Sequence, residues 1–106
     1  MSDFDRTLFD KLSDELIDTG EAQPGTMMGF PCLKAKGSYF ACKDKATSTL
    51  IVKLTEKRVK ALVNSGEAKI FAPAGQLFKQ WAMMEVFDET LWRGVLREAK
   101  KLVEEA

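Results

Sequence analysis

The side chains with the most chemical potential in this sequence are two cysteines, Cys32 and Cys42, and the chain contains no histidine. Histidine is the most frequent general base, and the cysteine spacing does not fit the Cys-x-x-Cys pattern of redox and metal motifs. Glycines 25 and 29 match neither the dinucleotide-binding pattern nor the Walker pattern. We therefore expect no catalytic residues, no cofactor-binding residues and no metal site, and predict that the protein is not an enzyme.

The two cysteines are typical of reduced packing residues in a cytoplasmic protein. A regular two-residue hairpin turn at Lys36-Gly37 would pair Cys32 with Ala41, and would place the two thiols on opposite faces of a sheet. A shift of the strand register by one residue would bring the thiols together. A disulfide therefore stays open as an alternative.

Lysines on or between the predicted strands are candidates for contacts with an anion or a nucleic acid. They are Lys34, Lys36, Lys43 and Lys53. Grouped on one side, they could contact three or four phosphates of a nucleic acid. The plainer alternative for Lys53, which lies in mid-strand, is an alkyl stem along the exposed sheet face with the ammonium group in water.

Several aromatic residues flank two loops that contain glycine and proline. They are Phe30, Phe71, Phe78 and Trp81. Aromatic side chains bury large apolar areas, so packing in the core would account for them. The alternative is a shallow pocket or a partner surface at the place where the two loops meet.

The elements that must position these residues can be predicted from the apolar periodicity. Residues 3–18 and 89–104 carry apolar side chains at helical spacing, and residues 56–65 carry a shorter stripe of the same kind. The stretch from Thr26 to Leu54 is typical of a meander of three strands. Two more strands are predicted at residues 69–71 and 79–87, and residues 21–25, which include Pro24, are predicted to be a linker.

The resulting order α-β-β-β-α-β-β-α predicts an α+β fold: an antiparallel sheet of about five strands with helices packed mainly on one face. A chain of 106 residues suits a single domain over residues 1–106. No apolar run approaches the ~20 residues of a membrane span. The acidic N-terminus lacks the features of a signal peptide, so we expect a cytoplasmic protein with no membrane contact.

The formal net charge is zero, but the charges are unevenly distributed. Residues 22–81 carry ten basic and three acidic side chains, whereas residues 1–21 carry two basic and seven acidic ones. The acidic helices could lie against the basic sheet and neutralise it. Otherwise the basic centre could attract nucleic acid, although basic domains that bind it usually have a pI above about 9 and this chain has a pI of about 6.3.

The order of several short segments resembles the TfoX N-terminal domain family, which is related to the YjbR-like domains. These segments are Met28-Gly29-Phe30, then Lys36-Gly37 followed by Tyr39-Phe40-Ala41, then the strand from Leu50 to Leu54, the loop from Phe71 to Gly75 and the strand with Trp81. Gly29-Phe30 stands where the family has Gly-Gly, and Lys36-Gly37 replaces its Asp-Gly. The similarity runs from about Phe4 to Val103.

The resemblance implies a stand-alone single domain of regulatory character, because that family includes competence regulators. We therefore expect a small non-enzymatic domain with a regulatory or protein-interaction role, acting through an unknown protein partner or through self-association. The alternative is a module that binds nucleic acid weakly through a basic sheet face. Longer members of the family carry a second helical domain that this sequence does not include, so the resemblance does not extend to a competence role.

Overall fold

The computed structural model describes residues 8–27, 29–44, 47–72, 75–76 and 78–105. Within these ranges, the helices are α1 (Leu8–Asp18), α2 (Glu56–Asn64) and α3 (Glu89–Glu105). The strands are β1 (Gln23–Met27), β2 (Phe30–Ala35), β3 (Ser38–Lys43), β4 (Leu50–Lys53), β5 (Ala68–Phe71) and β6 (Phe78–Met84).

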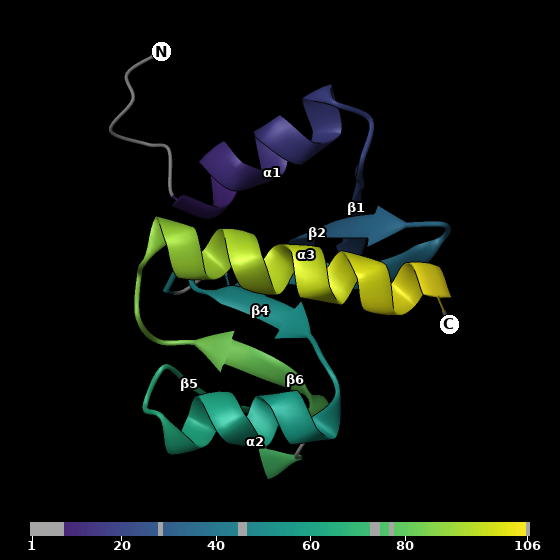
Figure 1. The fold of residues 1–106 in the computed structure, drawn as a ribbon. Coiled ribbons are helices and arrows are strands. Elements are labelled where there is room, and N and C mark those ends of the chain that lie inside the picture. The colour runs from purple at the N-terminus through teal and green to yellow at the C-terminus, as the bar shows by residue number, and fades with distance from the viewer. Residues whose placement is uncertain (1–7, 28, 45–46, 73–74, 77, 106) are drawn as a thin grey trace.

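The strands form one sheet in the order β1-β2-β3-β4-β6-β5, in which all neighbours are antiparallel (Figure 1). This arrangement confirms the predicted α+β class. Six strands are present where about five were predicted, because residues 23–27 form the edge strand β1 and not a linker. Pro24 is compatible with an edge strand, where a missing N–H group leaves no gap in the interior ladder. The last strand ends at Met84, three residues before the predicted end.

The helices begin and end at the residues that their capping chemistry dictates. The Thr55 hydroxyl accepts a hydrogen bond from the backbone N–H of Arg58 at 3.2 Å, and a carboxylate oxygen of Asp88 accepts one from Leu91 N–H at 2.9 Å. Helix α2 ends at Asn64, and Gly66 follows at φ 82°, a left-handed conformation that glycine adopts without steric cost. Residues 3–7 of the predicted first helix lie outside the described residues.

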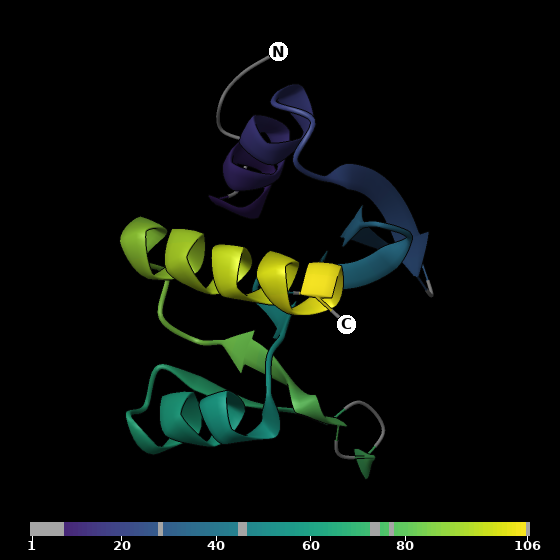
Figure 2. The same cartoon turned by 45° about the vertical axis from the view of Figure 1, so that its right-hand side comes forward.

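The main core lies between the sheet and the three helices, as Figures 1 and 2 show from two directions. Helix α3 crosses β2, β3 and β4, and α2 covers β5 and β6. Trp92 is the largest fully buried side chain, and its indole N–H donates to the carbonyl oxygen of Val86 at 2.8 Å. We call this side of the sheet the helix-covered face. Among the described residues, no helix has both the length and the apolar character that crossing a bilayer requires.

The β2–β3 hairpin has the predicted two-residue turn, with φ of 51° at Lys36 and 79° at Gly37. Beyond this turn the register shifts by one residue, because Phe40 is an extra residue in β3 and forms a β-bulge. Leu33 therefore pairs with Ala41, not with Phe40 as a regular hairpin would require. The bulge decides which face receives each side chain of residues 41–43.

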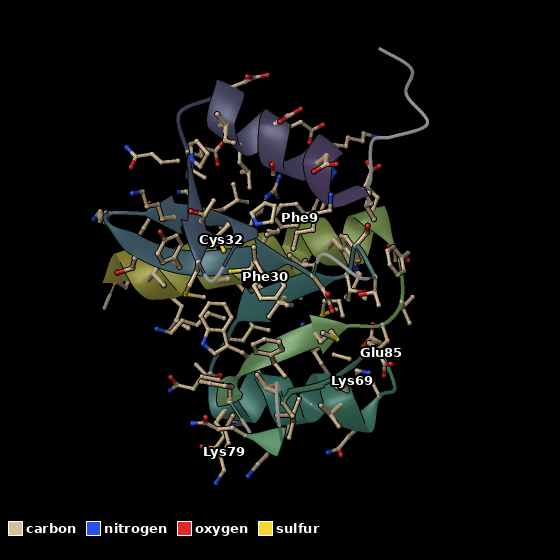
Figure 3. All side chains as sticks on the ribbon, turned by 180° about the vertical axis from the view of Figure 1, so that it is seen from behind. Phe9, Phe30, Cys32, Lys69, Lys79 and Glu85 are labelled. Atoms are coloured by element: carbon tan, nitrogen blue, oxygen red, sulfur yellow. The ribbon has the colours of Figure 1, made fainter. Side chains whose placement is uncertain are left out.

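Cys32 and Cys42 are direct cross-strand partners as a result of the bulge. The regular register, which would have placed the two thiols on opposite faces, is wrong. Both cysteines are free and 3% exposed, and both belong to a small cluster with Ile51 on the side of the sheet away from the helices. We call this side the open face (Figure 3).

Candidate functional site

A hollow of about 340 Å³ lies on the open face. We call it the apolar hollow. Its lining consists of aromatic and aliphatic side chains and one thiol, contributed by every strand of the sheet: Met27, Phe30, Cys42, Ile51, Phe71, Phe78 and Trp81. Its size is at the lower end of the ~300–1,000 Å³ range of ligand pockets in proteins.

The strand register places the floor and walls of the apolar hollow. Cys42 pairs with Ile51, and Ile51 pairs in turn with Met83, so side chains from three neighbouring strands form a continuous row. At the margin toward β5, the rings of Phe71 and Phe78 lie 5.8 Å apart between centroids and are tilted by 33°. That geometry is within the range of favourable aromatic pairs.

The structure brings together all of the aromatic residues that the sequence singled out, since Phe30, Phe71, Phe78 and Trp81 line the same hollow. Each is half-buried and not fully enclosed in a core. Sequence reasoning did not include Met27 or Cys42 in this surface, and the bulge is what brings Cys42 to it. Whether a partner uses this surface stays a prediction.

A second hollow of about 460 Å³ adjoins the first and shares Phe30 and Phe71 with it. Its lining is more polar and includes Asp44, Thr47 and Lys69. The two hollows together extend from the end of β3 to the β5 edge. The open face therefore changes from apolar at its centre to mixed and charged at this margin.

The predicted lysine group is divided between the two faces of the sheet. Lys53 pairs with Trp81 and Lys34 pairs with Tyr39, and both aromatic partners belong to the open face. Lys36 is exposed at the hairpin turn. Lys43 is on the helix-covered face, where its ammonium group lies 3.3 Å from a carboxylate oxygen of Asp10 in α1.

The separation of Lys43 corrects the expectation that all four lysines could share one surface. The bulge turns Lys43 toward the helices, and a carboxylate of the acidic N-terminal helix neutralises it there. No described residue forms an ion pair with Lys34, Lys36 or Lys53. These three lysines could therefore bind an anion without breaking an ion pair to a described residue, as predicted.

Two lysines that sequence reasoning did not select lie near the β5–β6 end of the open face. Lys69 pairs with Met83 across the strands and has a carboxylate oxygen of Glu85 at 3.8 Å, and Lys79 is exposed on β6 (Figure 3). Alternation along β5 could have placed Lys69 on the same face as Phe71. The apolar hollow is thus bordered by lysines on two sides.

Burial raises the pKa of both thiols above the ordinary value of a cysteine, and more strongly for Cys42. The Cys32 thiol donates a hydrogen bond to the carbonyl oxygen of Phe30 at 3.2 Å. Both groups are therefore protonated at neutral pH, and their reactivity toward electrophiles is low because the thiolate is the nucleophile.

A separate charged cluster joins α1 to α3 outside the open face. The Arg93 guanidinium contacts carboxylate oxygens of Glu15 at 2.6 Å and Glu89 at 3.0 Å, and Lys11 contacts Glu89 at 2.7 Å. These cations lower the pKa of both carboxyl groups. In the part of the chain that the structure describes, no three Cys, Asp or Glu side chains are grouped so that they could hold a metal ion.

The comparisons with known proteins give no relative from which a function could be transferred. No protein-family model matches the sequence, and no curated protein and no solved structure matches it. The resemblance to the TfoX N-terminal domain family stays a prediction. The open face is therefore the feature of this chain that points to a function.

Proposed function

We propose that this chain is a non-enzymatic interaction module that binds a protein partner on the open face of its sheet. The partner segment that fits carries a large apolar side chain with acidic residues on both sides. The observation that carries the proposal is the apolar hollow at the centre of this face, with Lys53 paired with Trp81 of its lining and Lys34 paired with Tyr39 on the same face.

The lining of the hollow supports the apolar anchor. Its seven side chains offer an almost entirely apolar surface, which water solvates poorly. Protein interfaces commonly place an aromatic or aliphatic anchor from one partner in a pocket of this kind on the other. Trp81 and Phe30 are half-buried and would lose their remaining water contact when an anchor enters.

The lysines support the acidic flanks. Lys34 and Lys53 have no carboxylate partner among the described residues, so an incoming carboxylate displaces no existing ion pair. Complementary charge at the rim of an interface increases the association rate and selects the partner. The same charges disfavour a second copy docking through its own open face, since lysines would then oppose lysines.

The resemblance to the TfoX N-terminal domain family points in the same direction. That family includes regulators, and regulators act by binding other macromolecules. A regulatory interaction in the cytoplasm is therefore the role that we propose for this module.

Single-stranded nucleic acid is the second candidate ligand, because Trp81 lies beside Lys53 and Tyr39 lies beside Lys34 on the open face. Proteins that bind single strands combine aromatic rings that stack on bases with cations that contact phosphates. We rank this candidate second because the rings are half-buried, and because Lys43 is paired with Asp10 on the other face.

Synthetic peptides test the proposal directly. We would measure fluorescence anisotropy of labelled peptides with a central tryptophan flanked by glutamates, by serines or by lysines, together with an acid-flanked peptide that has alanine at its centre. The glutamate-flanked tryptophan peptide should bind about tenfold more tightly than the serine-flanked one, which corresponds to ~1.4 kcal/mol. The lysine-flanked and alanine-centred peptides should bind weakest.

Two pairs of variants locate the binding. Lys53→Glu should weaken binding of the acidic peptide, whereas Lys57→Glu makes the same charge change on exposed α2 and should leave it unchanged. Phe71→Ser should weaken binding, whereas Val86→Ser alters an exposed side chain outside the hollow and should not. Equal binding of all the peptides, or equal effects within each pair, would refute the proposal. Binding of a labelled oligothymidine in place of the peptides would reverse the order of the two candidates.

A further inference from the structure

We propose that Cys32 and Cys42 form a dithiol site that hydrogen peroxide, or a small organic peroxide, converts into an intramolecular disulfide. The β-bulge at Phe40 makes the two cysteines direct cross-strand partners on the open face, and Cys42 lines the apolar hollow. This inference concerns covalent chemistry of the sheet and does not depend on the proposed partner.

The backbone geometry suits the bond. Residues directly opposite each other in an antiparallel pair have Cα atoms about 4.5–5.5 Å apart, and disulfides usually span about 4.4–6.8 Å. Both side chains lie on the open face and pack in the same small buried cluster, so the two thiols face the same space. Closing the bond therefore requires rotation of the side chains and no change in the strand register.

The apolar hollow gives a small neutral oxidant a route to the sulfur of Cys42. One thiol ionises, and its thiolate attacks a peroxide oxygen. The O–O bond breaks, and the sulfur loses two electrons and becomes a sulfenic acid. The released hydroxide, or the alkoxide from an organic peroxide, takes up a proton to give water or an alcohol. The sulfur of the second cysteine then attacks the sulfenic sulfur, the S–O bond breaks, and hydroxide leaves with the thiol proton as water.

Two features of the site determine the outcome. Ionisation is rare at neutral pH because burial raises both pKa values, so oxidation should be slow and should accelerate as the pH rises. A sulfenic acid formed at either position has the other sulfur beside it, so ring closure should outpace further oxidation. The product should be the disulfide, with little sulfinic or sulfonic acid.

Peptide mapping of the full chain after peroxide treatment tests the inference. The folded protein would be treated near pH 8, unfolded in N-ethylmaleimide to block remaining thiols, and digested with trypsin without reduction. The expected product links residues 12–34 to residues 37–43, because lysines at positions 11, 34, 36 and 43 separate the two cysteines into different peptides. Dithiothreitol should separate the linked pair. Mapping is needed because the five methionines also take up oxygen and would obscure the intact mass.

The single variants Cys32→Ser and Cys42→Ser are the matched controls, with Cys42→Ala as a replacement if a serine disturbs folding. Each should lose the linked peptides, and its remaining cysteine should accumulate sulfinic or sulfonic acid. The inference fails if the folded native chain yields those acids, or disulfides between chains, in place of the linked pair. It also fails if the folded chain keeps both thiols throughout prolonged treatment, including at a pH above 8, while the same chain in guanidinium chloride is oxidised.

Discussion

The ring of Tyr39 lies against Gly25, so closely that a β-carbon at position 25 would be 2.8 Å from Cε1 of the ring. The Tyr39 hydroxyl also donates to the carbonyl oxygen of Thr26 at 3.0 Å. Tyr39 belongs to β3 and both of its contacts belong to β1, so the side chain passes over β2 and ties the edge strand to the sheet. This contact covers one end of the open face.

Gly25→Ala should destabilise the fold by ~1–3 kcal/mol, because the added methyl group would displace the Tyr39 ring. Urea denaturation monitored by circular dichroism would measure the change. Gly94→Ala is the matched control: apart from its chain neighbours and the backbone of helix α3, no described atom lies within 4 Å of the new β-carbon. It should stabilise the protein by ~0.5–1 kcal/mol. Equal changes in unfolding free energy for Gly25→Ala and Gly94→Ala would contradict the contact between Gly25 and the Tyr39 ring.

Trp92→Ala should cost ~3–5 kcal/mol of unfolding free energy, because the side chain is fully buried and its N–H group is bonded to Val86. Trp81→Ala should cost clearly less, since Trp81 lines the apolar hollow and is only half-buried. Denaturant melts of both variants would give the comparison. A loss of less than about 1 kcal/mol for Trp92→Ala would show that the helix-covered core is not built around this residue.

The Arg93 cluster predicts a dependence of stability on pH. Glu15 and Glu89 have pKa values below the ordinary value of 4.5 in the folded chain, so their contribution is present above that value and is lost as the pH falls through the folded pKa. Arg93→Met should therefore lower the melting temperature near neutral pH. The difference in melting temperature between this variant and the native chain should become smaller toward pH 3, because Glu15 and Glu89 take up protons there.

Arg97→Met on the same helix provides the control for this pH effect. Arg97 has no ion pair with a described residue. Its replacement should therefore change the melting temperature by an amount that does not vary with pH. If the two variants follow the same pH curve, the ion pairs between α1 and α3 do not contribute to stability.

Salt dependence distinguishes the lysines if the ligand is nucleic acid. Phosphate contacts from Lys34, Lys36 and Lys53 would give a slope of about −2.7 for log affinity against log salt, and binding would weaken about 40-fold between ~50 and ~200 mM salt. Lys53→Ala should make the slope less steep by ~0.9, whereas Lys43→Ala, on the helix-covered face, should leave it unchanged. Anisotropy titrations with an oligothymidine would measure both slopes. A change in slope with Lys43→Ala would show that Lys43 reaches the ligand.

The sequence predicted those features of the fold that depend on local chemistry. Gly37 marks the hairpin turn because a left-handed conformation is required there, and Thr55 marks the start of α2 because its hydroxyl caps the helix. Strand β1 was missed because Pro24 and Gly25 are typical of a linker. A glycine is needed at position 25 because the Tyr39 ring lies against it, and Tyr39 is distant in sequence.

The sequence predicted only part of the candidate site, namely the grouping of its aromatic residues. Phe30 and Phe71 flank the two loops at which the sequence predicted a shallow pocket or partner surface, and both residues line the hollow on the open face. The positions of Cys42 and Lys43 were not accessible, because both depend on one extra residue in β3. The packing of Phe40 and Ala41 side by side under the helices accompanies that bulge, and no local pattern indicates it.

The bulge at Phe40 also determines how this hairpin can tolerate changes in length. Deleting Phe40 would remove the bulge and restore a regular ladder, and the residues that follow would keep their partners in β2 and their faces. Closing the bulge without a deletion would instead exchange those faces. The Lys43 ammonium would then lie on the open face, and the Cys42 thiol would turn toward the helices. Homologous hairpins should therefore carry either the bulge or a β3 strand that is one residue shorter, with the same alternation of faces from Ala41 onward.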